Sequence, residues 1–320
     1  MEKNSKIQIL RALSIIAVVL IHTCPGGSWQ VVCRPFINFA VAMFIFLSGY
    51  LTRIENDDWM SFYKKRITRV LIPYVIWNVL YTLSKGGGVI AILSNLVTTK
   101  ASPQLYYIFV YIQFVLLTPL LGKLVQSRYR WLGWFIAPAS TMIFKYYWLL
   151  SGNELNKYVA IMWDVCCLGW FTYYYLGLLL GNKIKICNYN VKILGMFCAL
   201  SILLQMAEGY GWLQLGDVNC GTQLKLTSFL TSTICILLAY KFLNDDTFRL
   251  KSKWLVLIGD YSFGIYLSHI LIMKVLAHIP YYSAVPYVVN SMIVLALSFL
   301  CVMIGKKICG KKLSRWIGLT

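Results

Sequence analysis

Long apolar runs, separated by short polar and basic segments, make up most of this chain. Ten runs have roughly the 17 to 25 residues that a helix needs to cross the hydrocarbon of a bilayer. They lie near residues 7–23, 33–52, 70–84, 104–122, 131–150, 166–182, 191–208, 224–243, 254–277 and 284–305. Pro138 and Lys145 interrupt the fifth run, and a candidate re-entrant stretch follows the third. The pattern predicts an all-α, polytopic membrane bundle of about ten transmembrane helices.

Composition and charge agree with a membrane protein and indicate its orientation. The chain of 320 residues is 59% hydrophobic and 13% charged, which is too apolar for a soluble domain. Of its 30 lysines and arginines, 23 fall in alternate loops and at both ends, and 7 fall on the other side. By the positive-inside rule, both termini are therefore expected in the cytoplasm. The net charge of +19 follows from topology, because no basic run is interleaved with aromatic residues as in a nucleic-acid-binding surface.

The organisation of the chain and its cysteines and histidines narrow the possibilities further. No composition shift or repeat marks a second domain, so we expect a single domain over residues 1–320. The first apolar run lacks a small-residue cleavage site and is expected to be retained. No C-x-x-C pair or histidine spacing indicates a metal site. Cys24 and Cys33 are either a disulfide at one external turn or apolar filler, and both interpretations stay open.

Arg11 and His22 are the only ionisable residues of the first apolar run. Eleven positions at about 100° each return to within roughly 20° of the starting direction, so both side chains leave one helical face, about 16 Å apart. Ser14, Ile15 and Val18 lie on the same face. Because an ionisable side chain in a membrane is costly unless it faces protein or water, this face indicates a functional cavity. Two structural interpretations remain open: Arg11 as a snorkelling anchor, and His22 as an interfacial histidine without chemistry.

A basic segment at 53–69 precedes the third run and contains Arg66 and Arg69, which are three residues apart and share a helical face. Its apolar and aromatic residues fit a helix on the membrane surface. The arginine pair can hold the phosphates of an anionic donor by charge-assisted hydrogen bonds. It can equally be an orientation signal that contacts only lipid headgroups, and the residues alone do not decide between these functions.

Two further stretches carry polar groups at positions that are expected inside the membrane. The second run ends with Ser48 and Gly49, whose small side chains permit close helix packing. The ninth run contains Asp260, Tyr266 and His269. Polar groups at this depth face a cavity or each other, although Asp260 is also a normal residue at a helix start.

In their order and spacing, these motifs resemble the integral-membrane acyltransferase-3 family, the O-acetyltransferases of bacterial envelope glycans. The motifs are Arg11 and His22 with ten residues between them, F-x-F-x-S-G-Y-L at 44–51, R-x-x-R-x-x-x-P at 66–73, L-Y-Y-I-F at 105–109, Y-Y-L-G at 174–177 and S-F-G-I-Y-L-S-H at 262–269. One motif departs from the family. Where many relatives carry R-F-A-V-P, this chain has Asn38-Phe-Ala-Val-Ala42, and we expect Arg34, one helical turn earlier, to supply the missing cation.

The resemblance implies transfer of an acyl group, usually acetyl, from cytoplasmic acyl-CoA to a hydroxyl of a glycan. His22 is the expected general base or a transient acyl carrier, and Arg11 is expected to hold the donor or to stabilise developing charge. Arg66 and Arg69 are the expected donor-binding residues. A further set is expected to line the pocket: Arg34, Asn38, Ser48, Tyr266 and His269.

The expected partners are acyl-CoA as donor, an envelope glycan or lipid-linked oligosaccharide as acceptor, and membrane lipids. The expected location is the bacterial cell membrane, and no metal is expected. Some relatives carry an appended extracytoplasmic domain that passes the acyl group onward, and we expect none here, which favours direct transfer. The alternative from another class is a transporter or flippase for lipid-linked sugars. Its signature would be paired broken helices in two related halves, and the sequence shows no such pairing.

Overall fold

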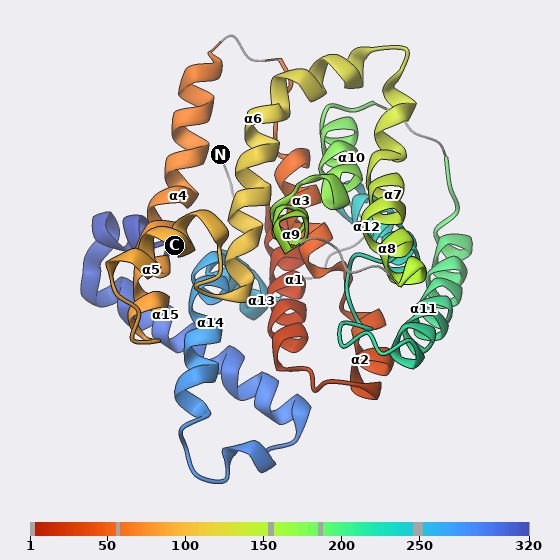
Figure 1. Cartoon of the computed structure of the whole chain (residues 1–320). Coiled ribbons are helices and arrows are strands. Elements are labelled where there is room, and N and C mark those ends of the chain that lie inside the picture. The colour runs from red at the N-terminus through yellow and green to blue at the C-terminus, as the bar shows by residue number, and fades with distance from the viewer. Residues whose placement is uncertain (1–3, 56–57, 153–156, 185–187, 246–251, 320) are drawn as a thin grey trace. The chain divides into compact units, whose positions relative to one another are not determined.

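The protein is described by a computed structural model that covers residues 4–55, 58–152, 157–184, 188–245 and 252–319. Every regular element in these ranges is helical, as the sequence predicted (Figure 1). The α-helices are α1 (Ser5–Thr23), α2 (Ser28–Cys33), α3 (Phe39–Tyr50), α4 (Trp59–Leu83), α5 (Val89–Thr98), α6 (Tyr106–Gln126), α7 (Ile136–Thr141), α8 (Tyr147–Ser151), α9 (Lys157–Val165), α10 (Phe171–Gly181), α11 (Val191–Gln214), α12 (Leu226–Asn244), α13 (Lys253–Asp260), α14 (Ser262–Leu276) and α15 (Tyr287–Ile317). Shorter turns are η1 (Arg34–Phe36), η2 (Pro103–Leu105), η3 (Arg130–Trp134), η4 (Met142–Tyr146), η5 (Leu168–Trp170) and η6 (Tyr282–Ala284).

Among the described residues, six helical segments are long and apolar enough to cross a membrane. They are Ser5–Thr23, Ser28–Tyr50, Pro103–Gln126, Val191–Gln214, Leu226–Asn244 and Tyr287–Gly310. A seventh is reached if α13 and α14, which break at Tyr261, count as one span. Each of the seven coincides with a predicted apolar run. The protein is therefore a multi-pass membrane protein, while the count of ten spans and the cytoplasmic termini stay predictions.

Within the described ranges, the other three predicted runs do not form a single helix that is long and apolar enough to cross a membrane. Residues 70–84 lie in α4, whose first half carries the basic segment and lowers its mean hydropathy. Residues 131–150 divide into short pieces, η3, α7, the π-helical turn η4 and α8. Residues 166–182 form η5 and α10, a helix of only 11 residues. Four residues of the charge count, Lys3, Lys185, Arg249 and Lys251, lie outside the described residues.

The fold divides into two compact units, and we describe each by itself. The first comprises residues 1–55, 120–154 and 168–259, and the second comprises residues 56–119, 155–167 and 260–320. The prediction of one acyltransferase domain over residues 1–320 stays a prediction. Both units are built from segments that are distant in sequence, so each depends on helix packing between distant parts of the chain.

The core of the first unit is the contact between α3 and α10. Side chains Phe171 to Leu180 of α10 are buried, as expected of a helix that is apolar on every face. Gly49 of α3 faces Gly177 of α10, and a methyl group on either would collide with the backbone of the other helix. Gly181 likewise lies against the backbone of Tyr50. The small residues let two backbones approach closely, and this confirms the expected role of Gly49.

The remaining helices of the first unit pack around this pair. α1 packs on α3 and α12, and α11 packs on α12 and α2. Figure 1 shows α1 and α3 side by side in red, and α11 next to α2. Only one stripe of α11 is buried, and it consists of Ser201, Gln205, Gly209 and Trp212. The rest of α11 exposes apolar side chains, as a lipid-facing helix does.

The second unit is organised around α4, α14 and α15. Nε1 of Trp77 donates a hydrogen bond of 2.9 Å to the Ile317 carbonyl, which connects α4 to the end of α15. α5, which corresponds to the predicted re-entrant stretch, is held against α4 because the Tyr74 hydroxyl donates to the Leu96 carbonyl at 2.8 Å. Gln113 of α6 donates to the Val165 carbonyl at 2.6 Å and so connects α6 to α9. Polar side chains thus join the helices of this unit at several levels.

Candidate active site

Helix α1 presents Arg11 and His22. It is continuous from Ser5 to Thr23, and Oδ1 of Asn4 caps it by accepting a hydrogen bond of 3.0 Å from the Lys6 amide. Both Arg11 and His22 are half-buried. Because no residue breaks the helix between them, they stay about 16 Å apart along its axis.

The side chains between Arg11 and His22 on this face are buried. Ser14 and Ile15 are fully buried and Val18 is 4% exposed. The Ser14 hydroxyl donates to the Leu10 carbonyl of the preceding turn at 2.8 Å, which satisfies it without a partner from another helix. Leu13, by contrast, is exposed. The face that carries the two ionisable groups is therefore turned toward protein rather than lipid.

Arg34 and Asn38 lie together. Nε of Arg34 donates to Oδ1 of Asn38 at 3.2 Å. Asn38 is 1% exposed, and its Nδ2 donates to Oε1 of Gln205 at 2.6 Å and to the Gly221 carbonyl at 3.2 Å. The guanidinium thus contacts Asn38, the position at which Arg34 is expected to supply a cation. Its role as the replacement cation stays a prediction.

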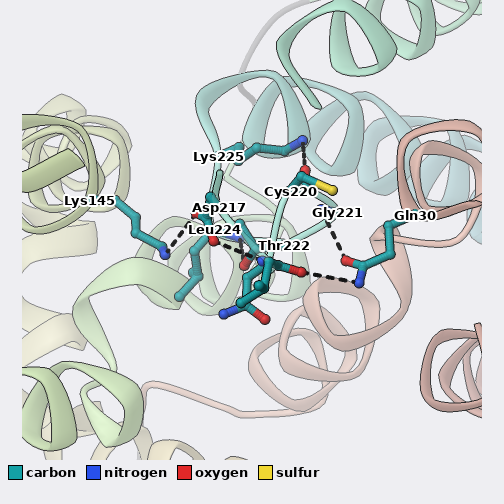
Figure 2. A network of polar contacts seen from close by, with 10 residues as sticks. Gln30, Lys145, Asp217, Cys220, Gly221, Thr222, Leu224 and Lys225 are labelled. Carbon is teal, nitrogen blue, oxygen red and sulfur yellow. Dashed lines mark hydrogen bonds and ion pairs between the residues drawn. The ribbon is translucent and has the colours of Figure 1, made fainter. Parts of the chain in front are cut away.

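A second anchor joins α2 to the loop between α11 and α12. Oε1 of Gln30 accepts a hydrogen bond of 3.2 Å from the Gly221 amide, and its Nε2 donates to the Val218 carbonyl at 3.3 Å. Figure 2 shows Gln30 and Gly221 facing each other across this junction. The charge pattern predicts that this end of the unit is extracytoplasmic. The two hydrogen bonds attach the loop to α2, the helix that follows α1 in the chain.

The same loop contains a buried lysine. Lys225 is 1% exposed, and its Nζ donates to the Cys220 carbonyl at 2.7 Å (Figure 2). Burial lowers the pKa of Lys225 from its ordinary value, and the negative charge of Glu208 opposes this shift. Lys145 and Asp217 form an ion pair of 3.8 Å at the edge of the loop. Both lysines thus contact this loop, Lys225 through the Cys220 carbonyl and Lys145 through Asp217.

Ser48 and the two cysteines complete the predicted positions of the first unit. The Oγ of Ser48 is buried and has no hydrogen-bond partner among the residues that the structure describes. It lies next to Gly49, so the small side chain serves the α3–α10 contact whether or not it also binds a ligand. Cys24 and Cys33 both lie in the described part of the chain, and no disulfide joins them.

Arg66 and Arg69 lie in α4 of the second unit. Arg66 is half-buried and its guanidinium lies 5.0 Å from the centre of the Phe62 ring, while Arg69 is exposed. The ring fixes the orientation of Arg66 by a cation–π contact. The predicted surface helix and the third span form one continuous helix here. The pair therefore shares one face of α4, as its spacing predicted.

Tyr266 and His269 lie on α14 of the second unit. His269 is fully buried, and its Nδ1 is 3.1 Å from the Ile265 carbonyl. The Tyr266 hydroxyl donates to the Gln104 carbonyl, and the Tyr266 and His269 ring centres are 6.4 Å apart. Both side chains thus face the interior of the unit, as polar groups at this depth must.

The structure brings some predicted residues together and shows others that the sequence analysis missed. Arg34 joins Asn38, and Tyr266 joins His269. Gln205 and Lys225 were missed, although one signal was present. Ser201, Gln205 and Gly209 recur every fourth residue in an otherwise apolar run, and this spacing marks a buried stripe on a membrane helix.

Helical spans with buried polar side chains at their interfaces define the protein as a multi-pass membrane protein with an internal polar site. The chain belongs to the integral-membrane acyltransferase-3 family, because a family model described as an acyltransferase domain matches residues 4–306. A search of curated proteins found no match, and neither did a search of solved structures. The protein is therefore a membrane acyltransferase, and the family does not favour the transporter alternative.

Proposed function

We propose that the protein moves an acyl group, most simply acetyl, from cytoplasmic acyl-CoA to a hydroxyl of an envelope glycan or its lipid-linked precursor in the bacterial cell membrane. The observation that carries this proposal is α1. Arg11 and His22 stand near the two ends of one helical face, and the side chains between them are buried in protein. Family membership supplies acyl transfer as the reaction class.

The donor enters from the cytoplasmic end in this proposal. Arg66 and Arg69 bind phosphates of CoA, for which a planar guanidinium offers paired donors. The contact of Arg66 with Phe62 supports this role, because it orients the guanidinium before the donor arrives. Arg11 holds an anionic part of the donor near the cytoplasmic end of α1.

His22 acts at the other end as general base. Its imidazole takes the proton of the glycan hydroxyl as the hydroxyl oxygen attacks the thioester carbonyl carbon. The new carbon–oxygen bond forms an ester, the carbon–sulfur bond breaks, and the CoA sulfur leaves as a thiolate that takes up a proton. A half-buried histidine suits this task, because it stays accessible to a substrate while adjacent protein holds the ring.

Distance poses the central mechanical requirement. The intact α1 keeps Arg11 and His22 about 16 Å apart, so they do not act on one atom. The pantetheine arm of CoA must therefore span the interval on either of two routes. In the first, the glycan hydroxyl attacks the thioester directly. In the second, His22 attacks it, carries the acyl group as an acyl-imidazole and passes it to the acceptor. The second route releases CoA before the acceptor reacts.

The test combines donor binding with product analysis. Purified full-length protein should bind acetyl-CoA, and envelope glycans from cells with the gene should carry acetyl esters that are missing without it, as seen by mass spectrometry. Unchanged glycans together with no acetyl-CoA binding would overturn the proposal. Acyl-enzyme that accumulates on His22 when acceptor is omitted would select the covalent route.

A further inference from the structure

A polar cluster in the second unit adjoins Tyr266 and contains side chains that the proposed function does not use. Tyr81 of α4 is fully buried, and its hydroxyl donates to the Leu267 carbonyl at 2.7 Å and accepts from the Leu271 amide at 3.1 Å. The same phenol faces Ser102 and Gln104 near η2. Three chain segments thus converge on one side chain.

Lys274 of α14 adds a cation to this cluster. Its Nζ lies 5.3 Å from the centre of the Tyr81 ring. This nitrogen is buried and has no hydrogen-bond partner within the described ranges. A cation–π contact compensates only part of the cost of burying an ammonium group. Lys85 acts on Lys274 by charge repulsion, which adds to that cost.

Gln104 adds a hydrogen-bond donor. Its side chain is 1% exposed, and its Oε1 accepts a hydrogen bond of 2.5 Å from the Ser102 hydroxyl. The carbonyl of Gln104 accepts from the Tyr266 hydroxyl. With the residue held at both of these oxygens, Nε2 is left without a hydrogen-bond partner in the part of the chain that is described. A buried amide donor in this state is costly unless a ligand supplies an acceptor.

Topology gives no reason for these cations. Lys85 and Lys274 belong to the seven that the charge pattern places away from the cytoplasm, where the positive-inside rule does not favour them. We propose that Lys274 and Gln104 bind an oxoanion, a carboxylate or phosphate group, carried by the molecule that receives the acyl group. The cluster supplies one cation, Lys274 Nζ, and one neutral donor, Gln104 Nε2, and these two groups suit an anionic oxygen group. The assignment to the acceptor rests on the proposed function, whereas the anion site itself does not.

The experiment measures anion binding without any transfer reaction. Full-length protein is placed in phosphatidylcholine nanodiscs, and binding of radiolabelled inorganic phosphate and of radiolabelled glucuronate is measured by equilibrium dialysis. Lys274→Met and Gln104→Leu should each weaken binding, by roughly tenfold or more for the lysine, because a charge-assisted hydrogen bond is lost. Lys274→Arg should keep most of the affinity. Lys100→Met, which removes an exposed lysine, should bind like the unaltered protein.

Addition of phosphatidic acid to the nanodiscs distinguishes two sources of the group. If phosphatidic acid competes with the radiolabelled anions, the site binds a lipid-borne phosphate. If it does not compete, the site binds a soluble acidic group such as a uronic acid. No measurable binding, or equal binding by Lys274→Met, Gln104→Leu and Lys100→Met, would overturn the proposal. Anion binding that depends on Lys274, in a protein that neither binds acetyl-CoA nor acetylates glycans, would keep the site and reject the proposed function.

Discussion

The half-buried positions of His22 and Arg11 determine what each side chain can do. Each is attached to a continuous helix whose intervening side chains are buried. Neither can therefore move along the axis toward the other without unwinding hydrogen-bonded turns. In the proposed function His22 therefore acts on the acceptor hydroxyl and Arg11 on the donor, and each role can be tested by itself.

Replacing His22 by Ala should abolish detectable glycan acetylation at equal amounts of membrane-inserted protein. Loss of a general base typically lowers a rate by about 10² to 10⁴. Acetylation is measured by mass spectrometry of envelope glycans. His278→Ala is the matched control, because His278 is exposed, and it should behave like the unaltered protein. Near-normal acetylation by His22→Ala would reject the assignment and make His269 the next candidate base.

Arg11→Ala should instead weaken acetyl-CoA binding, because it removes a cation at the donor end of the face. A lost charge-assisted hydrogen bond corresponds to roughly tenfold or more in affinity. The measurement is a binding titration with purified protein, with His22→Ala as the comparison that should retain donor affinity. Equal donor affinity in Arg11→Ala and the unaltered protein would contradict a donor-binding role and return Arg11 to the role of a lipid anchor.

Sequence could predict Arg34 beside Asn38 but not Gln205 and Lys225. The first relation is local, because the two residues are one helical turn apart. Asn38 and Gln205 are separated by 167 positions, and their contact depends on how α11 packs. Helical periodicity shows which face of a helix is polar, but it does not show which other helix packs against that face.

At the scale of elements, α4 carries the basic pair on one continuous helix, so its orientation and its chemistry can be separated. Arg66→Lys with Arg69→Lys keeps the charge that orients the helix and loses the planar donors. CoA affinity should therefore fall while membrane insertion stays unchanged. The measurement is a CoA titration, with Lys64→Arg and Lys65→Arg on the same helix as the control pair. Unchanged affinity would assign the arginines to orientation alone.

The contact between α3 and α10 makes a second element-scale prediction. Gly181→Ala inserts a methyl group against the backbone of Tyr50, and overpacking of this kind costs about 1–3 kcal/mol. Gly195→Ala in α11 is the matched control, because it points into open space, and it should be neutral or slightly stabilising. Thermal unfolding in one neutral detergent gives the comparison. Equal stability of the two variants would show that the helices separate easily.

At the scale of the whole molecule, the sequence predicted the all-helical class of fold, and seven of the ten predicted runs coincide with candidate spans among the described residues. It did not predict that residues 131–150 divide at α7 and η4, or that α10 is only 11 residues long. Pro138 and Lys145, which interrupt this run in the sequence, lie inside α7 and η4 respectively. The short α10 follows from burial on all sides, since a helix surrounded by protein need not span the hydrocarbon by its own length. Three of the ten apolar runs thus lie outside the candidate spans of the described residues, and the count of ten stays a prediction.

Orientation is the prediction that belongs to this scale. Reporters fused to the two ends should both report the cytoplasm, because 23 of the 30 lysines and arginines fall on that side. An enzyme reporter that is active only outside the cytoplasm should be silent at both ends. A fusion at the loop between α11 and α12, which the same pattern places outside, provides the positive control. An active reporter at the C-terminus would reject the even number of crossings and with it the placement of His22.

The unbroken α1 also fixes the distance between the two side chains that the proposed function uses. A helix fixes the interval between two side chains far more rigidly than a loop does, so Arg11 and His22 set a minimum reach for any donor that serves both at once. In direct transfer, a truncated thioester with the same reactive bond but no pantetheine arm could contact His22 or Arg11 but not both. The truncated donor should then have a lower kcat as well as a weaker affinity, because contacts remote from the reacting carbon also stabilise the transition state. A relay through His22 sets the same minimum length, because the imidazole must attack the thioester carbon before CoA leaves, so the shorter donor should be a poor substrate on both routes.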